Sequence, residues 1–125
     1  LTGVTNIVVA ESSLGSVLYT TSRSGGGDLL AYRIEADGGL ALLDSRPIAG
    51  QAQAGTVNTL NFVDGRLYLT GAENAALTQI EISDDGTFSS VSEVTGAALP
   101  AQLLATETLE VNGLTFMYGL TQSLA

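Results

Sequence analysis

The sequence predicts an all-β fold of antiparallel strands, and three observations lead to this prediction. Asp-Gly or Asn-Gly dipeptides separate runs of β-forming residues, those runs alternate in polarity, and parts of the sequence recur at a fixed spacing. Both dipeptides favour tight hairpins because both residues tolerate positive φ. They occur at Asp37-Gly38, Asp64-Gly65, Asp85-Gly86 and Asn112-Gly113. Four such signals in a chain of 125 residues favour antiparallel hairpins throughout.

The runs beside these turns alternate with a period of two, as half-buried strands do. Leu30, Tyr32 and Ile34 fall on one face of their run, and Leu29 and Ala31 fall on the other. Choosing one face of each run gives a predicted core. It consists of Leu18, Leu30, Tyr32, Ile34, Leu67, Leu69, Ile80, Ile82, Phe116 and Tyr118.

The spacing of the recurring parts predicts the architecture. Residues 63–71 align with 111–119, and residues 34–38 align with 82–86, both at an offset of 48. The hairpin residues, an aromatic and the closing glycine correspond in the first pair. A period near 50 residues with about four strands per unit is typical of β-propeller blades.

We therefore expect a single propeller-like domain over residues 1–125, with antiparallel four-stranded blades, about two and a half in number. The first blade covers about 5–46, with strands near 5–10, 16–22, 28–35 and 40–46. The second covers about 57–94, with strands near 57–63, 66–71, 76–83 and 87–94. A half blade covers about 104–119, with strands near 104–111 and 114–119.

The charge of the chain is one-sided. Thirteen acidic residues face four arginines, there is no lysine, and the net charge is −9. Nucleic-acid binding needs basic residues that displace counterions from phosphates, and anionic membranes attract basic segments, so we expect neither partner. No apolar run approaches the roughly 18 residues of a membrane span. With no cysteine either, the composition is compatible with an extracellular or cell-surface bacterial protein, although a cytoplasmic or periplasmic one can share it.

The missing residue types restrict the chemistry. Histidine, cysteine and lysine are all absent, which removes Ser-His-Asp triads, thiol nucleophiles, Schiff bases and ordinary zinc sites. Carboxylate, arginine, tyrosine and hydroxyl groups are what is left. We predict no catalytic residues and no cofactor-binding residues, and enzymatic activity of the chain itself is not expected.

The stretch Leu30-Ala31-Tyr32-Arg33-Ile34-Glu35-Ala36-Asp37-Gly38-Gly39-Leu40 resembles the blade hairpin of lactonase-like, YVTN-like bacterial β-propellers. Residues 78–88 carry a looser copy, and Leu18-Tyr19-Thr20-Thr21 is similar to the strand before that hairpin. The resemblance implies the propeller fold more than a function. Such lactonases place histidine, glutamate and arginine around a central funnel, and this chain departs from that pattern because it has no histidine.

A second resemblance concerns calcium. Gly25-Gly26-Gly27-Asp28-Leu29 resembles one copy of the glycine-rich repeat of secreted RTX, or haemolysin-type, calcium-binding proteins. Stacked copies of that repeat cage each ion, so a single copy is more in keeping with a loop. Asp84 and Asp85 form the one adjacent acidic pair and fall in a hairpin turn, where aspartate also caps its own backbone. Asp28, Asp84 and Asp85 are therefore the candidate calcium ligands.

These observations predict a non-catalytic, propeller-type binding or scaffold domain from a larger secreted or surface protein. Its partners would be the missing blades of the same protein or a symmetric copy of the chain. One alternative is part of a lactonase-like hydrolase whose reactive residues lie outside this chain. Another is an oligomeric, lectin-like ring, against which the absence of tryptophan counts.

Overall fold

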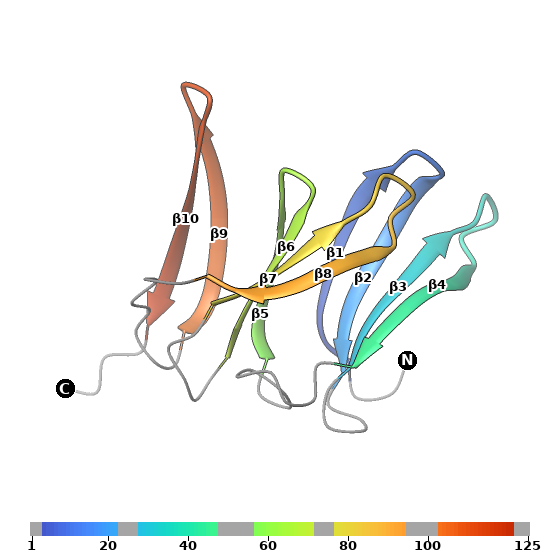
Figure 1. Ribbon diagram of the computed structural model, residues 1–125, viewed down its shortest axis with the longest axis horizontal. Helices are drawn as coiled ribbons and strands as arrows, with labels where there is room; N and C mark the ends of the chain where they lie inside the picture. The colour runs from blue at the N-terminus through green and yellow to red at the C-terminus, as the bar shows by residue number, and fades with distance from the viewer. Residues whose placement is uncertain (1–3, 23–27, 48–56, 72–76, 95–102, 122–125) are drawn as a thin grey trace.

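The structure, a computed structural model, describes residues 4–22, 28–47, 57–71, 77–94 and 103–121, and every element within these ranges is a strand (Figure 1). Sheet I contains β1 (Val4–Ser12), β2 (Gly15–Ser22), β3 (Asp28–Ile34) and β4 (Leu40–Pro47). Sheet II contains β5 (Val57–Val63), β6 (Arg66–Gly71), β7 (Leu77–Ile82) and β8 (Phe88–Glu93). The terminal hairpin contains β9 (Leu103–Val111) and β10 (Leu114–Thr121). Neighbouring strands in each sheet follow one another along the chain and are antiparallel.

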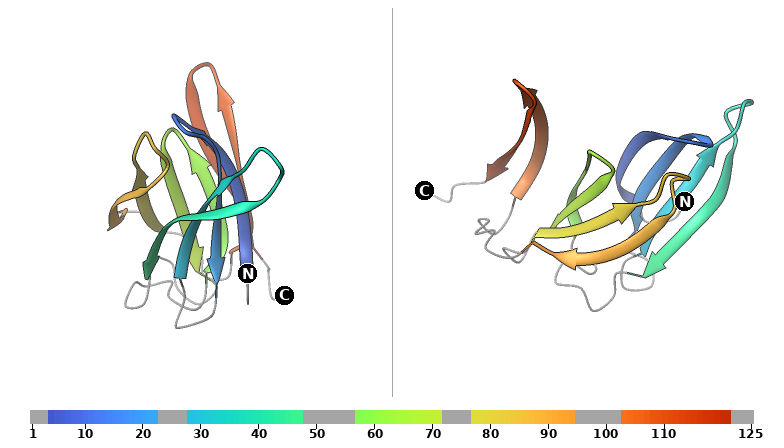
Figure 2. Two further views of the ribbon diagram at one scale, coloured as in Figure 1. Left: turned by 90° about the vertical axis from the view of Figure 1, so that its right-hand side faces the viewer. Right: turned by 45° about the horizontal axis from the view of Figure 1, so that its top comes forward.

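The all-β prediction is confirmed, and each expected strand ends within two residues of the observed one. The three sheets succeed one another in space, with sheet II between sheet I and the terminal hairpin (Figures 1 and 2). The first strand of each sheet lies beside the first strand of the next sheet. Strand β5 therefore has β1 on one side and β9 on the other. Sheet II therefore has sheet I on one side and the terminal hairpin on the other.

The turns are of two kinds. Asp64-Gly65 and Asn112-Gly113 form two-residue hairpins in which both residues have positive φ, with values of 49° and 53° at Asp64 and Asn112. At Asp37 and Asp85 the expectation of positive φ at the aspartate is wrong, because positive φ is adopted there only by the following glycine. In these wider turns the aspartate accepts a hydrogen bond from the backbone two residues on instead.

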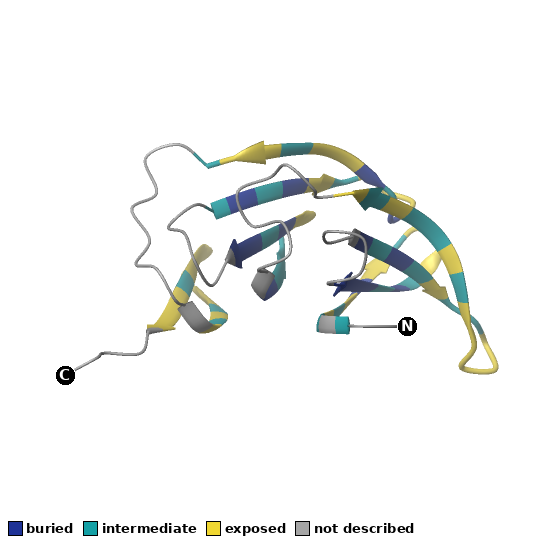
Figure 3. Ribbon diagram, turned by 90° about the horizontal axis from the view of Figure 1, so that it is seen from below, coloured by how far each residue is buried: buried dark blue, intermediate teal, exposed yellow. Residues whose placement is uncertain are grey.

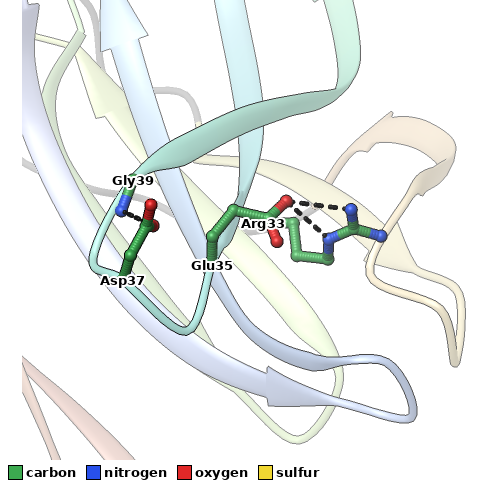
Figure 4. Close-up of polar contacts among 4 residues, drawn as sticks. All are labelled: Arg33, Glu35, Asp37 and Gly39. Carbon is green, nitrogen blue, oxygen red and sulfur yellow. Dashed lines mark hydrogen bonds and ion pairs between the residues drawn. The ribbon is translucent and has the colours of Figure 1, made fainter.

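The two wide turns have the same hydrogen bonds at an offset of 48 residues. Asp37 Oδ1 accepts from the N–H of Gly39 at 2.8 Å (Figure 4), and Asp85 Oδ1 accepts from the N–H of Thr87 at 3.0 Å. The Glu35 N–H donates to the Gly39 carbonyl at 2.8 Å, and the Ser83 N–H donates to the Thr87 carbonyl at 2.9 Å. The same turn thus joins the last two strands of both four-stranded sheets.

The core lies between sheets I and II, where Figure 3 shows buried positions on both. Leu67, Leu69 and Ile80 are buried as predicted, and Ile82 packs against the core. In sheet I the predicted face is wrong. The buried side chains are Val17, Tyr19, Leu29 and Ala31, whereas Leu18, Leu30, Tyr32 and Ile34 are only partly buried. Both faces of this sheet are apolar, so alternation alone does not say which face meets the next sheet.

Tyr19 joins the two sheets. Its ring stacks on Phe62 with a centroid distance of 6.1 Å and an interplanar angle of 7°, and it lies 5.9 Å from the ring of Phe88. Its hydroxyl donates a hydrogen bond of 2.8 Å to the carbonyl of Gly86. Aromatic pairs at such separations contribute beyond their buried area, and the hydroxyl needs a partner when buried.

The outer strands of sheets I and II are joined through the backbone of Phe88. Its N–H donates to Asp44 Oδ2 at 2.9 Å, and its carbonyl accepts from Arg46 Nη2 at 3.3 Å. Asp44 and Arg46 both lie on β4, and Phe88 begins β8. Two charged side chains of one edge strand therefore satisfy the main chain of the other.

The terminal hairpin rests on the opposite face of sheet II through polar contacts. Asn61 Nδ2 donates to the carbonyl of Thr106 at 3.3 Å, and the Thr106 hydroxyl donates to Asn61 Oδ1. Phe116 and Tyr118, predicted to be core residues, are 43% and 57% exposed. They lie on the side of the hairpin that faces away from sheet II, with no further sheet over them in the described part of the chain.

Candidate functional site

A hollow with a volume of about 420 Å³ lies between sheet II and the terminal hairpin. It opens near the β5–β6 and β9–β10 turns. Its lining residues are Val63, Asp64, Arg66, Tyr68, Leu77, Thr108, Gly113, Leu114, Thr115 and Met117. This volume falls within the range of roughly 300–1,000 Å³ that is typical of small-molecule sites.

The β5–β6 hairpin supplies the polar groups of the hollow. Arg66 and Tyr68 alternate with the buried Leu67 and Leu69 along β6, so they point away from the core and toward the terminal hairpin. Arg66 Nε lies 3.7 Å from Glu81 Oε1 on the neighbouring strand β7, and this ion pair holds the guanidinium group in place. From the facing hairpin, the Thr115 hydroxyl donates to Asp64 Oδ2 at 3.5 Å.

The side chains that line the hollow carry groups that can contact a small ligand. An arginine, a tyrosine, an aspartate and two threonines can hydrogen-bond a small polar ligand, and Leu77 and Met117 can contact its apolar parts. A nucleophile activated by a neighbouring base needs the two side chains within hydrogen-bond reach of each other. Among the residues that line the hollow, the Thr115 hydroxyl lies 3.5 Å from Asp64 Oδ2, which is a long contact for an activated pair.

A second hollow, of about 320 Å³, lies at the turn end of the junction between sheets I and II. Glu11, Ser12 and Ser13 line it from sheet I, and Phe62, Ile82 and Asp84 are among those lining it from sheet II. The Ser13 N–H donates to the Asp84 carbonyl at 2.8 Å and joins the two turns.

The structure does not bring the three candidate calcium ligands together. Asp28 begins β3 at the loop end of sheet I, where it pairs with Ser22, and its side chain lies outside the described residues. Asp84 and Asp85 lie in the β7–β8 turn, at the opposite end of the strands. Within the described ranges, no three carboxylates gather as a metal site would require.

Asp85 serves its own turn. Its Oδ1 accepts from both the hydroxyl and the N–H of Thr87, at 2.7 and 3.0 Å. The hydrogen bond from the Thr87 hydroxyl, with a second from its N–H, lowers the pKa of the Asp85 carboxyl. Both bonds are made to Oδ1, so this oxygen of the carboxylate serves the turn.

Arg33 forms an ion pair within its own strand end. Its Nη2 lies 2.9 Å from Glu35 Oε1, and its Nε donates to the same oxygen at 3.1 Å (Figure 4). Residues two apart along a strand share a sheet face, so this pair forms within one strand end and not across to a neighbouring strand. Three further polar residues of the sequence, Arg23, Glu73 and Asn74, lie outside the described residues.

Comparison with protein-family models, curated proteins and solved structures finds no match for this chain. The described part of the chain also contains no helix long and apolar enough to span a membrane.

Sequence reasoning missed the hollow beside the terminal hairpin. Its residues carry no recognisable motif, because they come from two hairpins that are far apart in the sequence. One signal was present: Arg66 and Tyr68 alternate with predicted core residues, so they had to project from the other face of their sheet.

Proposed function

We propose that this chain is a non-catalytic, propeller-type binding or scaffold domain of a secreted or surface protein. The observation that carries the proposal is the face-to-face packing of successive antiparallel sheets, with the same wide turn at an offset of 48 residues. Propeller blades are four-stranded sheets of this kind, repeated radially. Residues 30–40, whose sequence resembles a lactonase-like blade hairpin, run from β3 through the turn to the start of β4, and this supports the proposal.

The role of the chain in this proposal is to present surfaces. The hydrogen bond from the Tyr19 hydroxyl to the Gly86 carbonyl joins sheet I to sheet II. The hydrogen bond from Asn61 to the Thr106 carbonyl joins the terminal hairpin to sheet II. The hollow between sheet II and the hairpin then offers Arg66, Tyr68 and Asp64 to a ligand. The acidic net charge of −9 favours neutral or cationic partners over anionic ones.

The test is a hydrolysis assay that uses a simple lactone and the whole chain at high concentration. The proposal predicts a rate equal to that of buffer alone. Turnover above this rate that is lost in Arg66→Ala, but kept in Arg33→Ala, would overturn it in favour of a hydrolase. Arg33 is a suitable control because it is an exposed arginine of sheet I, away from the hollow.

Ligand binding is followed separately, through Met117. This residue is the single methionine of the chain and lines the hollow, so a ¹³C-methyl label gives one NMR signal that reports on the site. Titration with a monosaccharide tests the lectin-like alternative, which predicts a saturable shift of that signal.

A further inference from the structure

Among the described residues, two apolar sheet faces have no further sheet over them, one on sheet I and one on the terminal hairpin (Figure 1). The first, which we call the outer face of sheet I, lies on the side away from sheet II. Val9, Leu18, Tyr32 and Leu42 pair in one row across the four strands, and Ile34 pairs with Leu40. Ile7 and Leu30 lie on the same face, where both pair with the buried Thr20. Ile7 is 58% exposed and Leu42 is 62% exposed.

The second, the outer face of the hairpin, lies on the side away from sheet II. It comprises Ala105, Leu109, Val111, Leu114, Phe116, Tyr118 and Leu120, together with Glu107. Leu114, which lies next to the turn, also borders the hollow. Leu114 and Leu120 are each 62% exposed. Monomeric proteins rarely expose contiguous apolar patches larger than a few hundred Å², and larger ones mark interaction sites.

The interfaces inside the molecule indicate what fits the outer face of sheet I. Leu18 is the counterpart of Leu67 at an offset of 49, and Tyr32 is the counterpart of Ile80 at an offset of 48. Leu67 and Ile80 belong to the face of sheet II that sheet I covers. The outer face of sheet I is thus the same kind of face, without the sheet that would cover it.

The same comparison applies to the terminal hairpin. Its register repeats that of β5–β6 with an offset of 48: Asn61 pairs with Tyr68, and Leu109 pairs with Phe116. Asn61 and Tyr68 belong to the face of sheet II on which the terminal hairpin rests. The outer face of the hairpin therefore corresponds to a face that is covered by a neighbour within the molecule.

The outer face of the hairpin differs in polarity from the corresponding face of sheet II. Where sheet II has Asn61 and Arg66, the terminal hairpin has Leu109 and Leu114. The uncovered face is therefore the more apolar of the two, which is the reverse of what a permanently solvated surface needs. Its apolar character matches the outer face of sheet I, as the apolar faces of sheets I and II match in the core.

We infer that the outer face of the hairpin binds the outer face of sheet I of a second copy of this chain, in a head-to-tail contact. The inference rests on the proposed scaffold function, and it names the partner. Each copy carries both halves of the contact, so each association leaves one free face of each kind. Such a heterologous interface generates rings when its rotation closes and open chains when it does not.

A complementation experiment tests the inference. Leu42→Glu blocks the outer face of sheet I, and Leu109→Glu blocks the outer face of the hairpin. Ser89→Glu adds the same charge at an exposed position of β8, away from both faces, and serves as the matched control. Masses are measured by sedimentation equilibrium over a range of concentrations, on the full chain.

We expect concentration-dependent association of the original chain and of Ser89→Glu, and at least tenfold weaker association of each leucine variant alone. Mixing Leu42→Glu with Leu109→Glu should restore one contact and stop at a 1:1 dimer. A monomeric original chain would overturn the inference, and so would a mixture that stays monomeric. Undiminished association of either leucine variant alone would also overturn it.

Both leucines are largely exposed, so the variants are expected to fold; circular dichroism checks this. Ile7→Glu and Leu120→Glu replace them if one does not fold. A monomeric chain that hydrolyses no lactone would overturn the head-to-tail contact alone, whereas lactone turnover would overturn the proposed function. The two failures are therefore distinguishable.

Discussion

The Tyr19 hydroxyl of β2 donates a 2.8 Å hydrogen bond to the carbonyl of Gly86, which lies 67 residues away in the β7–β8 turn. It is a buried bond between sheets I and II, and it lies beside the stacked rings of Tyr19 and Phe62. Because residues so distant in sequence meet here, loss of this contact tests the packing of the two sheets directly.

Tyr19→Phe keeps the ring and removes the hydroxyl. The Gly86 carbonyl is then buried without its partner, so we expect a loss of about 1–3 kcal/mol in the free energy of unfolding. Urea denaturation followed by far-ultraviolet circular dichroism measures it. Tyr118→Phe is the control, because Tyr118 is exposed and should change stability little. Equal stabilities for the two variants would contradict the buried bond.

The pH dependence follows from the same residue. Burial raises the pKa of Tyr19 to about 12, and the charge of Asp85 adds to the shift. An unfolded tyrosine has a pKa of about 10, so the folded state holds its proton more tightly. This contribution to stability is complete below pH 10 and is lost as the pH rises through 12. The stability of Tyr19→Phe should fall less than that of the original chain between these values, and parallel curves would contradict the assignment.

Gly86→Ala should be far more destabilising than Gly38→Ala. Both glycines have positive φ, 92° and 85°, in turns with the same hydrogen bonds. A Cβ at Gly86 would lie 2.7 Å from Val17 Cγ2, whereas a Cβ at Gly38 would have no neighbour within 4 Å. Both variants lose about 1–2 kcal/mol from backbone strain, and the clash at Gly86 adds about 1–3 kcal/mol. Thermal unfolding of the two variants compares them, and equal losses would show that sheet I does not reach this turn.

Asp44→Ala should loosen the outer strands. The Asp44 carboxylate accepts from the N–H of Phe88 at 2.9 Å and from the N–H of Ser45 at 2.8 Å. Its removal should cost about 1–3 kcal/mol and speed hydrogen exchange at the Phe88 amide. Asp37→Ala, which breaks a hydrogen bond within one exposed turn, is the control and should leave that amide unchanged.

Asn61→Leu should release the terminal hairpin from sheet II while sparing the core. Asn61 makes both side-chain hydrogen bonds to Thr106, and a leucine can make neither. The Met117 methyl signal should move toward the chemical shift of a solvent-exposed methionine, and the Tyr19 ring signals should stay in place. Unchanged Met117 and a perturbed Tyr19 would contradict the arrangement.

The strands could be predicted from sequence because their signals are local. Turn dipeptides such as Asp64-Gly65 fix where hairpins reverse, and alternation fixes the runs between them. The side on which a sheet is covered is a tertiary matter. Leu29 and Leu30 are both leucines on adjacent positions of β3, yet Leu29 is buried and Leu30 is only partly so. No local pattern separates them.

The candidate site was harder to predict for a related reason. Asp64 and Thr115 meet across 51 residues through an ordinary turn and an ordinary strand, neither of which carries a motif. Of the aspartates that the sequence analysis named as candidate calcium ligands, Asp85 has a local role in the structure. Asp85 caps its turn through Thr87, as isolated acidic residues in hairpins often do.

The most direct test of the account is a measurement of nuclear Overhauser effects from the ring protons of Tyr19 in the full chain. Face-to-face packing of sheets I and II predicts cross-peaks to the rings of both Phe62 and Phe88. Cross-peaks within β1–β4 and within β5–β8, with none from Tyr19 to either phenylalanine, would contradict the packing on which the proposed function depends.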